Sequence, residues 1–238
     1  MDRWNLEETR KHIARLHGRH QLELAKPCIQ SVFDRQVYAR IHYQDARTKT
    51  DTYIRTELHE TSLLEVAFGD RDEAWEEFNI FVREVGAHLT ACIQSMHALP
   101  DILAHAVYYS LCLNISSAAL KSRDVGAASV SKLLKAKTEL AILGDLLTEF
   151  IKGGNFPHLS ALTNQAKHRS IVLPSLSEDW TGERKASHLL IFPAFSYESV
   201  CYPQVFADEF LKVEYKRCSE LVVKIGSSLN ALLCNRKP

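Results

Sequence analysis

The sequence lacks the motifs of several common enzyme and membrane classes. Only nine of its 238 residues are glycine, and no glycine-rich loop is followed by Lys-Ser or Lys-Thr, so nucleotide hydrolysis by the usual routes is not expected. No serine stands in a Gly-x-Ser-x-Gly turn, which argues against an α/β-hydrolase. Charged residues break every apolar run well before the roughly 20 residues that a membrane span needs. We therefore expect no membrane partner.

The chain also lacks a net charge and paired cysteines. Lys and Arg number 29 and so do Asp and Glu, so binding to nucleic acid or anionic lipid would need a local basic patch. The six cysteines are scattered without a Cys-x-x-Cys pair, mostly in apolar contexts, as small buried residues are. With no signal peptide in MDRWNLEETR, we expect a cytoplasmic protein in a reducing compartment.

What the sequence does contain is mostly helical periodicity. Residues 5–25 have apolar side chains at helical spacing and acids in the first turn, and Pro27 is expected to interrupt this helix. Residues 37–58 alternate apolar and polar side chains on both sides of a polar centre. This alternation predicts a β hairpin, although the first half of the stretch also fits a helix.

The strongest helical pattern begins near Asp70, because Asp70 and Glu73 resemble a capping box. Apolar side chains then recur on one helical face, namely Trp75, Phe78, Phe81, Val85, Leu89, Cys92 and Met96. Pro100 is typical of a first helical turn, so we expect a new helix over residues 100–121. Its side chains are apolar nearly all the way round, which predicts the central buried helix.

The remaining elements are shorter. A helix capped by Ser129 or Ser131 is expected to end at Gly153-Gly154, and a short helix follows it. Three further elements are expected from their periodicity: strands over residues 170–173 and 188–195, and a closing amphipathic helix over residues 208–233.

Together these patterns predict a mainly α fold, a bundle of five or six helices with one or two small β hairpins; an α+β arrangement stays open. With no internal repeat and no long linker, one compact domain over residues 1–238 is expected. It would comprise an N-terminal helix and hairpin in 1–60, a helical core in 70–168, and a hairpin and closing helix in 169–233.

The densest polar chemistry lies just before the first predicted strand. Asn164, Lys167, His168 and Arg169 fall within six residues, and Asn164 and His168 share a helical face. An imidazole beside an amide and a cation could act as general acid or base on a phosphodiester while the cation stabilises the anion. The same residues could instead hold an irregular junction, with the cations near a helix C-terminus and the others bonded to backbone.

A second candidate pair is Arg83 and His88, which four residues separate on the strongest helix. This spacing matches the Arg-x(4–6)-His signature of HEPN ribonucleases, in which the two side chains flank a scissile RNA phosphate. Such spacings also arise by chance, and four occur here: Arg10/His17, Arg15/His20, Arg35/His42 and Arg83/His88. The alternative interpretation is a solvated arginine and an ordinary helical histidine.

Near the N-terminus, Glu8, His12, His17 and His20 invite a metal site, because Glu8 and His12 are four residues apart. On a 3.6-residue helix, however, His17 and His20 point away from His12, and no His-Glu-x-x-His motif is present. We therefore expect a solvated histidine-rich face, with no bound metal and no cofactor.

Residues 164–169, Asn-Gln-Ala-Lys-His-Arg, resemble the Asn-x-x-Lys-His-Arg motif of a broad group of uncharacterised bacterial helical proteins. In that group an early hairpin is followed by a helix that ends near Ala-Leu-Asp-His-Leu, and residues 97–103, His-Ala-Leu-Pro-Asp-Ile-Leu, resemble this ending loosely. The resemblance covers about residues 37–173. It implies a small helical bundle that is similar in outline to the HEPN superfamily, and it implies no activity.

Two functions from different classes fit these observations. The first is a non-catalytic helical interaction protein, such as a subunit of a bacterial defence or toxin–immunity system, which binds a protein partner or a second copy of itself. The alternative is a HEPN-like, metal-independent ribonuclease, a homodimer that binds RNA and uses His168 or His88 with nearby arginine or lysine. The neutral net charge favours the first, since phosphate contacts supply much of a nuclease's affinity. Whether the chain is an enzyme stays open.

Overall fold

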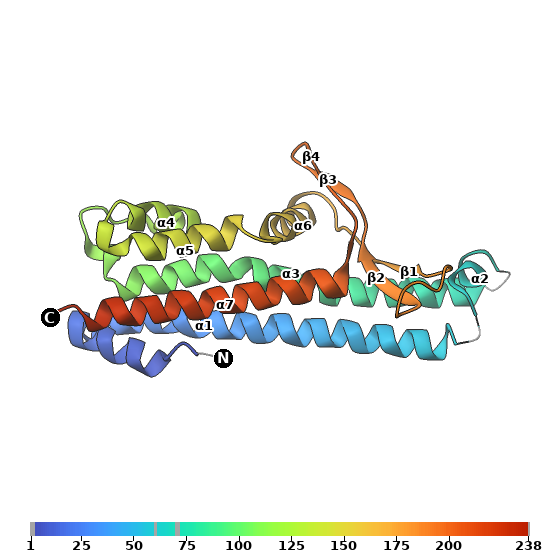
Figure 1. The fold of residues 1–238 in the computed structure, drawn as a ribbon, viewed down its shortest axis with the longest axis horizontal. Coiled ribbons are helices and arrows are strands. Elements are labelled where there is room, and N and C mark those ends of the chain that lie inside the picture. The colour runs from blue at the N-terminus through green and yellow to red at the C-terminus, as the bar shows by residue number, and fades with distance from the viewer. Residues whose placement is uncertain (1–2, 60, 70–71, 238) are drawn as a thin grey trace. The chain divides into compact units, whose positions relative to one another are not determined.

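The structure is a computed structural model that describes residues 3–59, 61–69 and 72–237. This part of the chain is mainly helical, with seven α-helices and two small antiparallel sheets, so the expected fold class is confirmed (Figure 1). The helices are α1 Leu6–Thr56, α2 Leu63–Phe68, α3 Asp72–Ser110, α4 Ala127–Lys135, α5 Ala141–Lys152, α6 Phe156–His168 and α7 Ala207–Cys234. The strands are β1 Ser175–Glu178, β2 His188–Phe192, β3 Phe195–Tyr197, β4 Val200–Tyr202 and β5 Val205–Phe206. No helix within the described ranges is long and apolar enough to cross a membrane.

The chain divides into two compact units, each assembled from separate stretches of sequence. Unit 1 comprises Met1–Val37, Met96–Pro157 and Glu214–Pro238, and unit 2 comprises Tyr38–Ser95 and His158–Val213. Helices α1, α3, α6 and α7 contribute residues to both units. The three regions expected from the sequence, 1–60, 70–168 and 169–233, therefore do not coincide with the two units.

Helix α1 occupies the stretch for which a hairpin is predicted, residues 37–58, and that prediction is wrong. The chain is helical through Thr56, and the side chains that it buries there are Ala39, Ala46, Thr50 and Tyr53. These positions recur every three to seven residues along one face of the helix. A stretch whose apolar residues alternate along the sequence can therefore also place apolar residues on one face of a helix. Packing of that face against the core favours the helix over the hairpin.

The break in α1 lies at Gly18 instead of Pro27. Gly18 is the non-helical residue of α1, with φ 80° and ψ 177°, whereas the helix continues through Pro27. Ala25 and Ile29, on either side of the proline, are fully buried in unit 1. We attribute the continuity of the helix to this burial, which outweighs the ~3 kcal/mol that proline costs inside a helix.

Helix α3 likewise runs through Pro100, so the prediction of a separate helix over residues 100–121 is wrong in both start and length. Its expected burial is found, since three successive core positions are inaccessible, namely Leu99, Leu103 and Val107. The helix ends at Ser110, and the backbone then turns at Cys112, whose φ of 57° is left-handed. The capping box predicted at Asp70 lies outside the described residues.

In unit 1, the helix predicted to end at Gly153 is two helices, α4 and α5, separated by a short 3-10 turn at Thr138–Leu140. Its end at Gly153 is as predicted. The start differs, because Gly126 is the N-cap and the hydroxyl of Ser129 accepts a hydrogen bond from the Gly126 N–H at 3.1 Å. Ser129 therefore caps α4 from the third position of the helix and is not itself the N-cap residue.

An arginine on α7 fastens the end of α5 in unit 1. Arg217 donates hydrogen bonds to the backbone carbonyls of Glu149 and Phe150 at 3.1 and 2.9 Å, and to the carboxylate of Glu214 at 2.5 Å. Glu214 has a fully buried side chain and also accepts from the N–H of Asn155 at 3.1 Å. One ion pair thus satisfies backbone groups on both sides of the α5–α6 connection.

Both sheets belong to unit 2. Strand β2 lies between β1 and β5 and is antiparallel to both, with Ser175 opposite Ile191. The first strand begins at Ser175, so the strand predicted over residues 170–173 is wrong. The strand forms where a side chain can be buried: Leu176 is in the core, whereas Ile171 and Leu173 are exposed.

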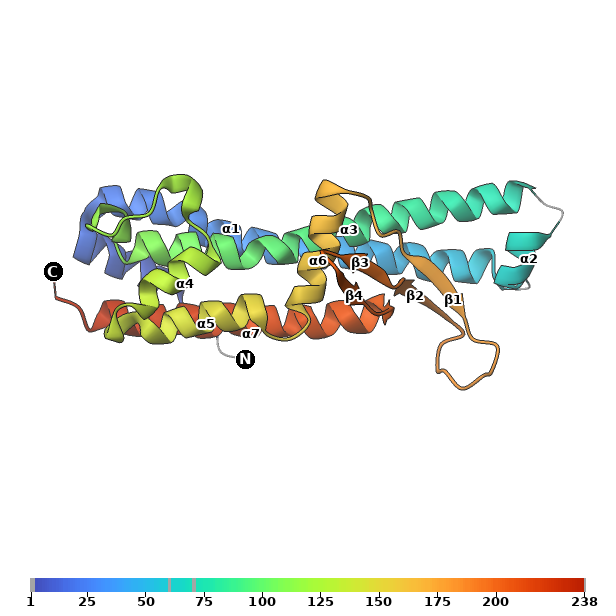
Figure 2. The same cartoon turned by 90° about the horizontal axis from the view of Figure 1, so that it is seen from above.

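The β3–β4 hairpin has no counterpart among the predictions. Its turn residues, Glu198 and Ser199, both have positive φ, 48° and 65°, as in the two-residue turns that suit the twist of a hairpin. The hairpin lies beside α6 in both ribbon views (Figures 1 and 2), where the ring of His158 is 5.6 Å from that of Phe195 and 5.1 Å from that of Tyr202. The unit 2 part of α6 thus supports the hairpin.

Candidate functional site

Within unit 2, the second part of α1 and the first part of α3 lie side by side and run antiparallel. Three contacts join them at successive levels: His42 with His88, Lys49 with Glu84, and Tyr53 with Phe81. Residues three or four positions apart share one face of a helix. This face of α1 therefore presents His42, Asp45 and Lys49 to α3 in sequence.

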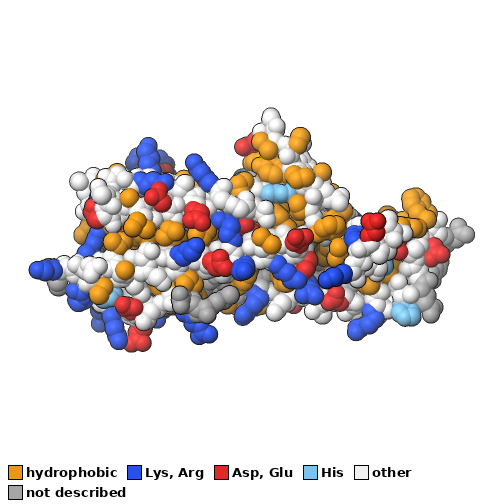
Figure 3. All heavy atoms as spheres, in the orientation of Figure 1, with side chains coloured by type: hydrophobic (Ala, Val, Ile, Leu, Met, Phe, Trp, Pro, Cys, Tyr) orange, Lys and Arg blue, Asp and Glu red, His pale blue; other side chains and the backbone are white. Residues whose placement is uncertain are grey.

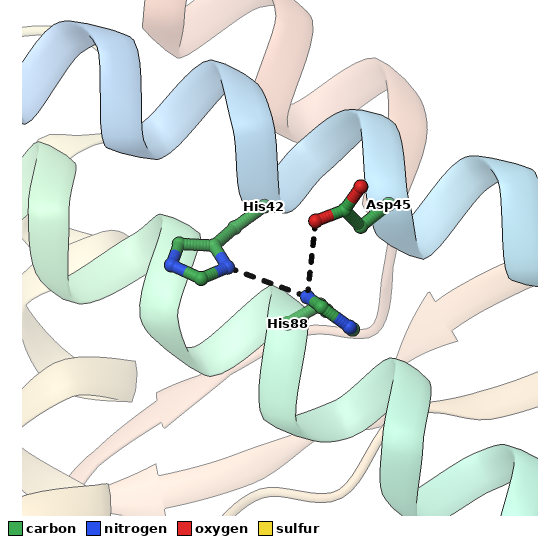
Figure 4. A group of neighbouring side chains, drawn as sticks. All are labelled: His42, Asp45 and His88. Carbon is green, nitrogen blue, oxygen red and sulfur yellow. Dashed lines mark hydrogen bonds and ion pairs between the residues drawn. The ribbon is translucent and has the colours of Figure 1, made fainter.

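The most concentrated polar group of this interface is formed by His42, Asp45 and His88 (Figure 4). Nδ1 of His42 lies 3.3 Å from Nδ1 of His88, and the latter atom lies 3.7 Å from Oδ2 of Asp45. One potential ligand atom from each residue lies within 4.8 Å of the other two. The side chains of His88 and Asp45 are 26% and 50% exposed, so solvent reaches the group.

The two facing Nδ1 atoms restrict how protons are placed in this group. A hydrogen bond between them requires that one imidazole carries a proton on Nδ1 and that the other offers a lone pair there. An ionised Asp45 can only accept. When neither Nδ1 carries a proton, two imidazole lone pairs and a carboxylate oxygen converge on one place, which suits it to hold a cation.

Neighbouring contacts fix the position of α3 at this level. Nζ of Lys49 donates to the carboxylate of Glu84 at 2.6 Å, and this hydrogen bond lowers the pKa of Glu84. At Gly86, a Cβ atom would lie 3.2 Å from Cδ of Pro174, so the lack of a side chain lets the segment before β1 pack closely against α3. These contacts lie within four residues before His88 on α3 and hold this part of the helix in place.

The predicted cluster at residues 164–169 lies at the C-terminal end of α6. Lys167 and His168 are exposed, and Nδ2 of Asn164 donates to the hydroxyl of Ser160 at 3.4 Å. The guanidinium of Arg169 lies 5.1 Å from the centre of the Tyr197 ring, a cation–π contact that ties the segment to β3. These contacts favour the structural interpretation of the cluster, as a junction between α6 and the hairpin.

The second predicted pair is separated by the geometry of the helix. Arg83 is exposed, and five residues place it about 140° around α3 from His88. The partners that the structure gives to His88 are a second imidazole and an acid, His42 and Asp45. His88 is therefore brought into a group with an acid, and the role predicted for Arg83 beside it stays a prediction.

The N-terminal histidines, His12, His17 and His20, do not form a comparable cluster of metal-binding side chains among the described residues. His12 lies 3.5 Å from the carboxylate of Glu8 and 3.4 Å from Nη2 of Arg15. His20 is exposed, and burial, with the charge of Arg236, lowers the pKa of His17. Within the described residues, the cluster that offers three metal-binding side chains is the one in unit 2.

Unit 2 also contains a cavity of about 250 Å³ with a mainly apolar lining. At its polar end, Tyr43 donates a hydrogen bond to Asp208, which also accepts from Lys212 at 2.6 Å and lies 3.8 Å from Nε of Arg47. Burial raises the pKa of Tyr43; it opposes ionisation of Asp208 too, but the hydrogen bonds from Lys212 and Tyr43 leave the pKa of Asp208 lowered. The polar groups at this end of the cavity are paired with one another, which favours a structural role for them.

Large hydrophobic side chains are exposed on α2 and the start of α3, and Figure 3 shows hydrophobic atoms gathered over α2. The four residues that form this α2–α3 surface are Leu64, Phe68, Trp75 and Ile80, with exposures of 51%, 82%, 45% and 58%. A shallow groove of about 390 Å³ adjoins it, lined by residues of α1 and α3 that include Ile80 and by Glu57, which follows α1. Its charged residues are Lys49, Glu57, Glu77 and Glu84.

Sequence reasoning singled out His88 but missed the pair His42 and Asp45, of which His42 is named only in one of the Arg–His spacings that can arise by chance. Their three-residue spacing places both on one face of a helix, but on opposite faces of a strand. Because residues 37–58 predict a hairpin, that signal stays hidden until the stretch is known to be helical. Comparison with known proteins adds no further information on these residues: no family model matches the chain, and neither a curated protein nor a solved structure is detectably similar to it.

Proposed function

We propose that this protein acts by binding a protein partner and catalyses no reaction itself, as a subunit of an assembly such as a defence or toxin–immunity system. The α2–α3 surface is the observation that carries the proposal. Its four large hydrophobic side chains are exposed within residues 64–80. Large apolar side chains that are exposed to water are stabilised when a partner covers them, and gathered exposed apolar side chains mark interaction sites.

The charges of the adjoining groove indicate the chemistry of the partner. Lys49 is paired with Glu84 at 2.6 Å, and the other two charged residues of the lining, Glu57 and Glu77, are both acidic. The same two acids act on the buried Tyr53, whose pKa burial and these charges raise to about 12. We infer that the partner presents an amphipathic helix with lysine or arginine beside its apolar face.

The ribonuclease alternative has less support from the contacts. His168 is exposed at the end of α6, and Arg169, beside it, is engaged with Tyr197. His88 lies beside the acid Asp45. An RNA phosphate needs cations close to the proton-transfer group, and the described neighbours of these histidines do not supply such a cleft. The alternative stays a prediction, and its test is given in the Discussion.

A direct test uses two synthetic helices that share one apolar face, one with lysine and arginine on its polar face and one with glutamate. Each labelled helix is titrated with the full chain, and fluorescence anisotropy reports binding. We expect the basic helix to bind, and to bind about tenfold more weakly after Ile80→Ser or after Glu57→Gln with Glu77→Gln. Raising the salt concentration should weaken the binding further.

The matched control is Ile142→Ser, since Ile142 is 68% exposed on α5 of unit 1. This variant should bind the basic helix as the wild type does. Equal binding of the basic and acidic helices, binding of neither, or an Ile80→Ser variant that binds normally would each overturn the proposal.

A further inference from the structure

We propose that His42, Asp45 and His88 form a binding site for one divalent transition-metal ion, with zinc as the ion that fits best. The three side chains would supply two imidazole nitrogens and one carboxylate oxygen, and would leave one coordination position to water. The binding of a protein partner does not require this site, so the two proposals hold or fail separately.

The distances between the ligand atoms carry the proposal. Zinc binds imidazole nitrogen and carboxylate oxygen at about 2.0–2.2 Å, so two ligands at a tetrahedral angle lie about 3.3–3.5 Å apart. The two Nδ1 atoms are 3.3 Å apart, and Nδ1 of His88 is 3.7 Å from Oδ2 of Asp45. All three ligand atoms lie within 4.8 Å of one another. Small rotations about the side-chain bonds would therefore place them around a single ion.

Two helices hold the three ligands, which favours a preformed site. His42 and Asp45 are three residues apart on α1 and share a face, and His88 projects toward them from α3 (Figure 4). Side chains on helices are held in place better than side chains on loops. Because the carboxylate of Glu84 is engaged by Lys49 one turn away, the site keeps three protein ligands.

The chemistry of the ligands selects among metals. Magnesium and calcium take oxygen ligands, whereas imidazole suits zinc, copper, nickel and iron. Structural zinc sites are closed by four protein ligands, while three protein ligands leave a position for water. The exposure of Asp45 gives that position access to solvent. We assign to the site the binding of the ion, and no reaction.

A contact between the two histidines without a metal is the rival explanation. In that case, one Nδ1–H donates to the other Nδ1, and Asp45 stabilises the pair by its charge. Both explanations predict that loss of either histidine weakens the packing of α1 on α3. Only the metal site predicts that zinc stabilises the wild type, and that this effect disappears with the histidines.

The experiment is a titration of the metal-free full chain with zinc chloride, followed by calorimetry. The exposed Cys201 and Cys234 are first changed to serine, because thiolates also bind zinc. We expect one ion per chain, no competition from magnesium, and a rise in the melting temperature on addition of zinc. Cobalt bound in place of zinc should give the intense visible absorption of a tetrahedral site, and X-ray absorption should show nitrogen and oxygen neighbours without sulfur.

The variants decide whether the ion is at the proposed place. His42→Ala and His88→Ala should each weaken zinc binding by more than about 100-fold, beyond the loss that outer-sphere changes cause, and Asp45→Asn by at least about tenfold. The matched controls are His168→Ala, at an exposed histidine of unit 2, and His12→Ala, at another histidine that lies beside a carboxylate. Both should bind zinc as the wild type does.

Circular dichroism checks the fold of each variant, and His88→Asn replaces His88→Ala if the latter loses helix. Three results would overturn the proposal. One is the absence of zinc binding by the wild type, another is binding that survives both histidine variants, and the third is a rise in melting temperature that persists in His42→Ala. The second result would assign the ion to other surface histidines.

Discussion

The indole of Trp4 lies directly on the backbone of α7 at Gly226. A Cβ atom at residue 226 would stand well under 3.0 Å from three carbon atoms of the ring, closer than real Cβ atoms approach any neighbour. Trp4 is 6% exposed, and its Nε1 donates to the hydroxyl of Thr9 at 2.8 Å, so the ring is held in place. Within unit 1, the ring of Trp4 thus packs where it does because residue 226 has no side chain.

Gly226→Ala is therefore expected to destabilise the protein by about 1–3 kcal/mol, the usual cost of overpacking, although alanine is the better helix former. Urea unfolding measures the change. Ser227→Ala, at the exposed neighbouring position, should have little effect. In the double variant with Trp4→Ala, the added cost of Gly226→Ala should be reduced, because the two sites interact. Equal stability of Gly226→Ala and wild type would contradict the contact.

Arg217→Ala is expected to cost about 3–5 kcal/mol, since it leaves the carboxylate of Glu214 buried without its partner charge. It also removes the hydrogen bonds to the last carbonyls of α5. Adding Glu214→Gln should recover part of the loss, because the unpaired charge is then gone. Thermal and urea unfolding provide the measurement, with Lys216→Ala as the exposed control on the same helix. A cost no greater than that of Lys216→Ala would show that the ion pair is not buried as described.

His158 is expected to make the stability of unit 2 depend on pH. Its ring lies 5.0 to 5.6 Å from the rings of Phe195, Tyr202 and Phe210, and its buried Nε2 has no hydrogen-bond partner among the described residues. Burial lowers its pKa, so the unfolded chain takes up a proton at a higher pH than the folded chain. The stabilisation is complete above the unfolded value of about 6.5 and is lost as the pH falls through the lower folded value.

The test is the free energy of unfolding in urea, measured at steps between about pH 7 and pH 5, the range around the unfolded histidine pKa. His158→Phe fills the same aromatic pocket without titrating and should show a smaller pH dependence than wild type. His17, whose pKa burial also lowers, adds a similar dependence in unit 1, and the difference between the two proteins removes it. An identical pH dependence in both proteins would refute the role of His158.

The ribonuclease alternative is tested by RNA cleavage in excess EDTA. We expect no cleavage of single-stranded, structured or transfer RNA by the wild type, and hence no difference for His168→Ala or His88→Ala. Arg169→Ala should instead weaken the β3–β4 hairpin by about 0.5–1 kcal/mol, through loss of the cation–π contact with Tyr197. Hydrogen exchange of the hairpin amides reports this change. Cleavage by the wild type that disappears in one histidine variant with an intact fold would support the ribonuclease alternative.

Elements with strong periodicity and clear ends could be predicted from the sequence. Helix α7 is expected over residues 208–233 and found at Ala207–Cys234, because its apolar stripe is regular along its whole length. The end of α5 at Gly153 follows from the glycine pair. The continuity of α1 through Pro27 could not be predicted, since it depends on tertiary packing that outweighs a local preference.

The candidate metal site could not be predicted from the sequence, for a different reason. His42 and His88 are 46 residues apart in the chain, and their contact depends on the antiparallel pairing of α1 and α3. No local pattern encodes such a pairing. The β3–β4 hairpin was missed because its strands have three residues each and its turn, Glu198-Ser199, lacks the glycine or asparagine that usually reveals such turns.

The interleaving of the two units has a consequence for synthesis. A ribosome releases the chain from its N-terminus, and domains tend to fold when all their residues are available. Every segment of unit 2 is made by Val213, whereas unit 1 still needs Glu214–Pro238. Unit 2 is therefore complete before unit 1, although residues 1–37 of unit 1 are made before any residue of unit 2.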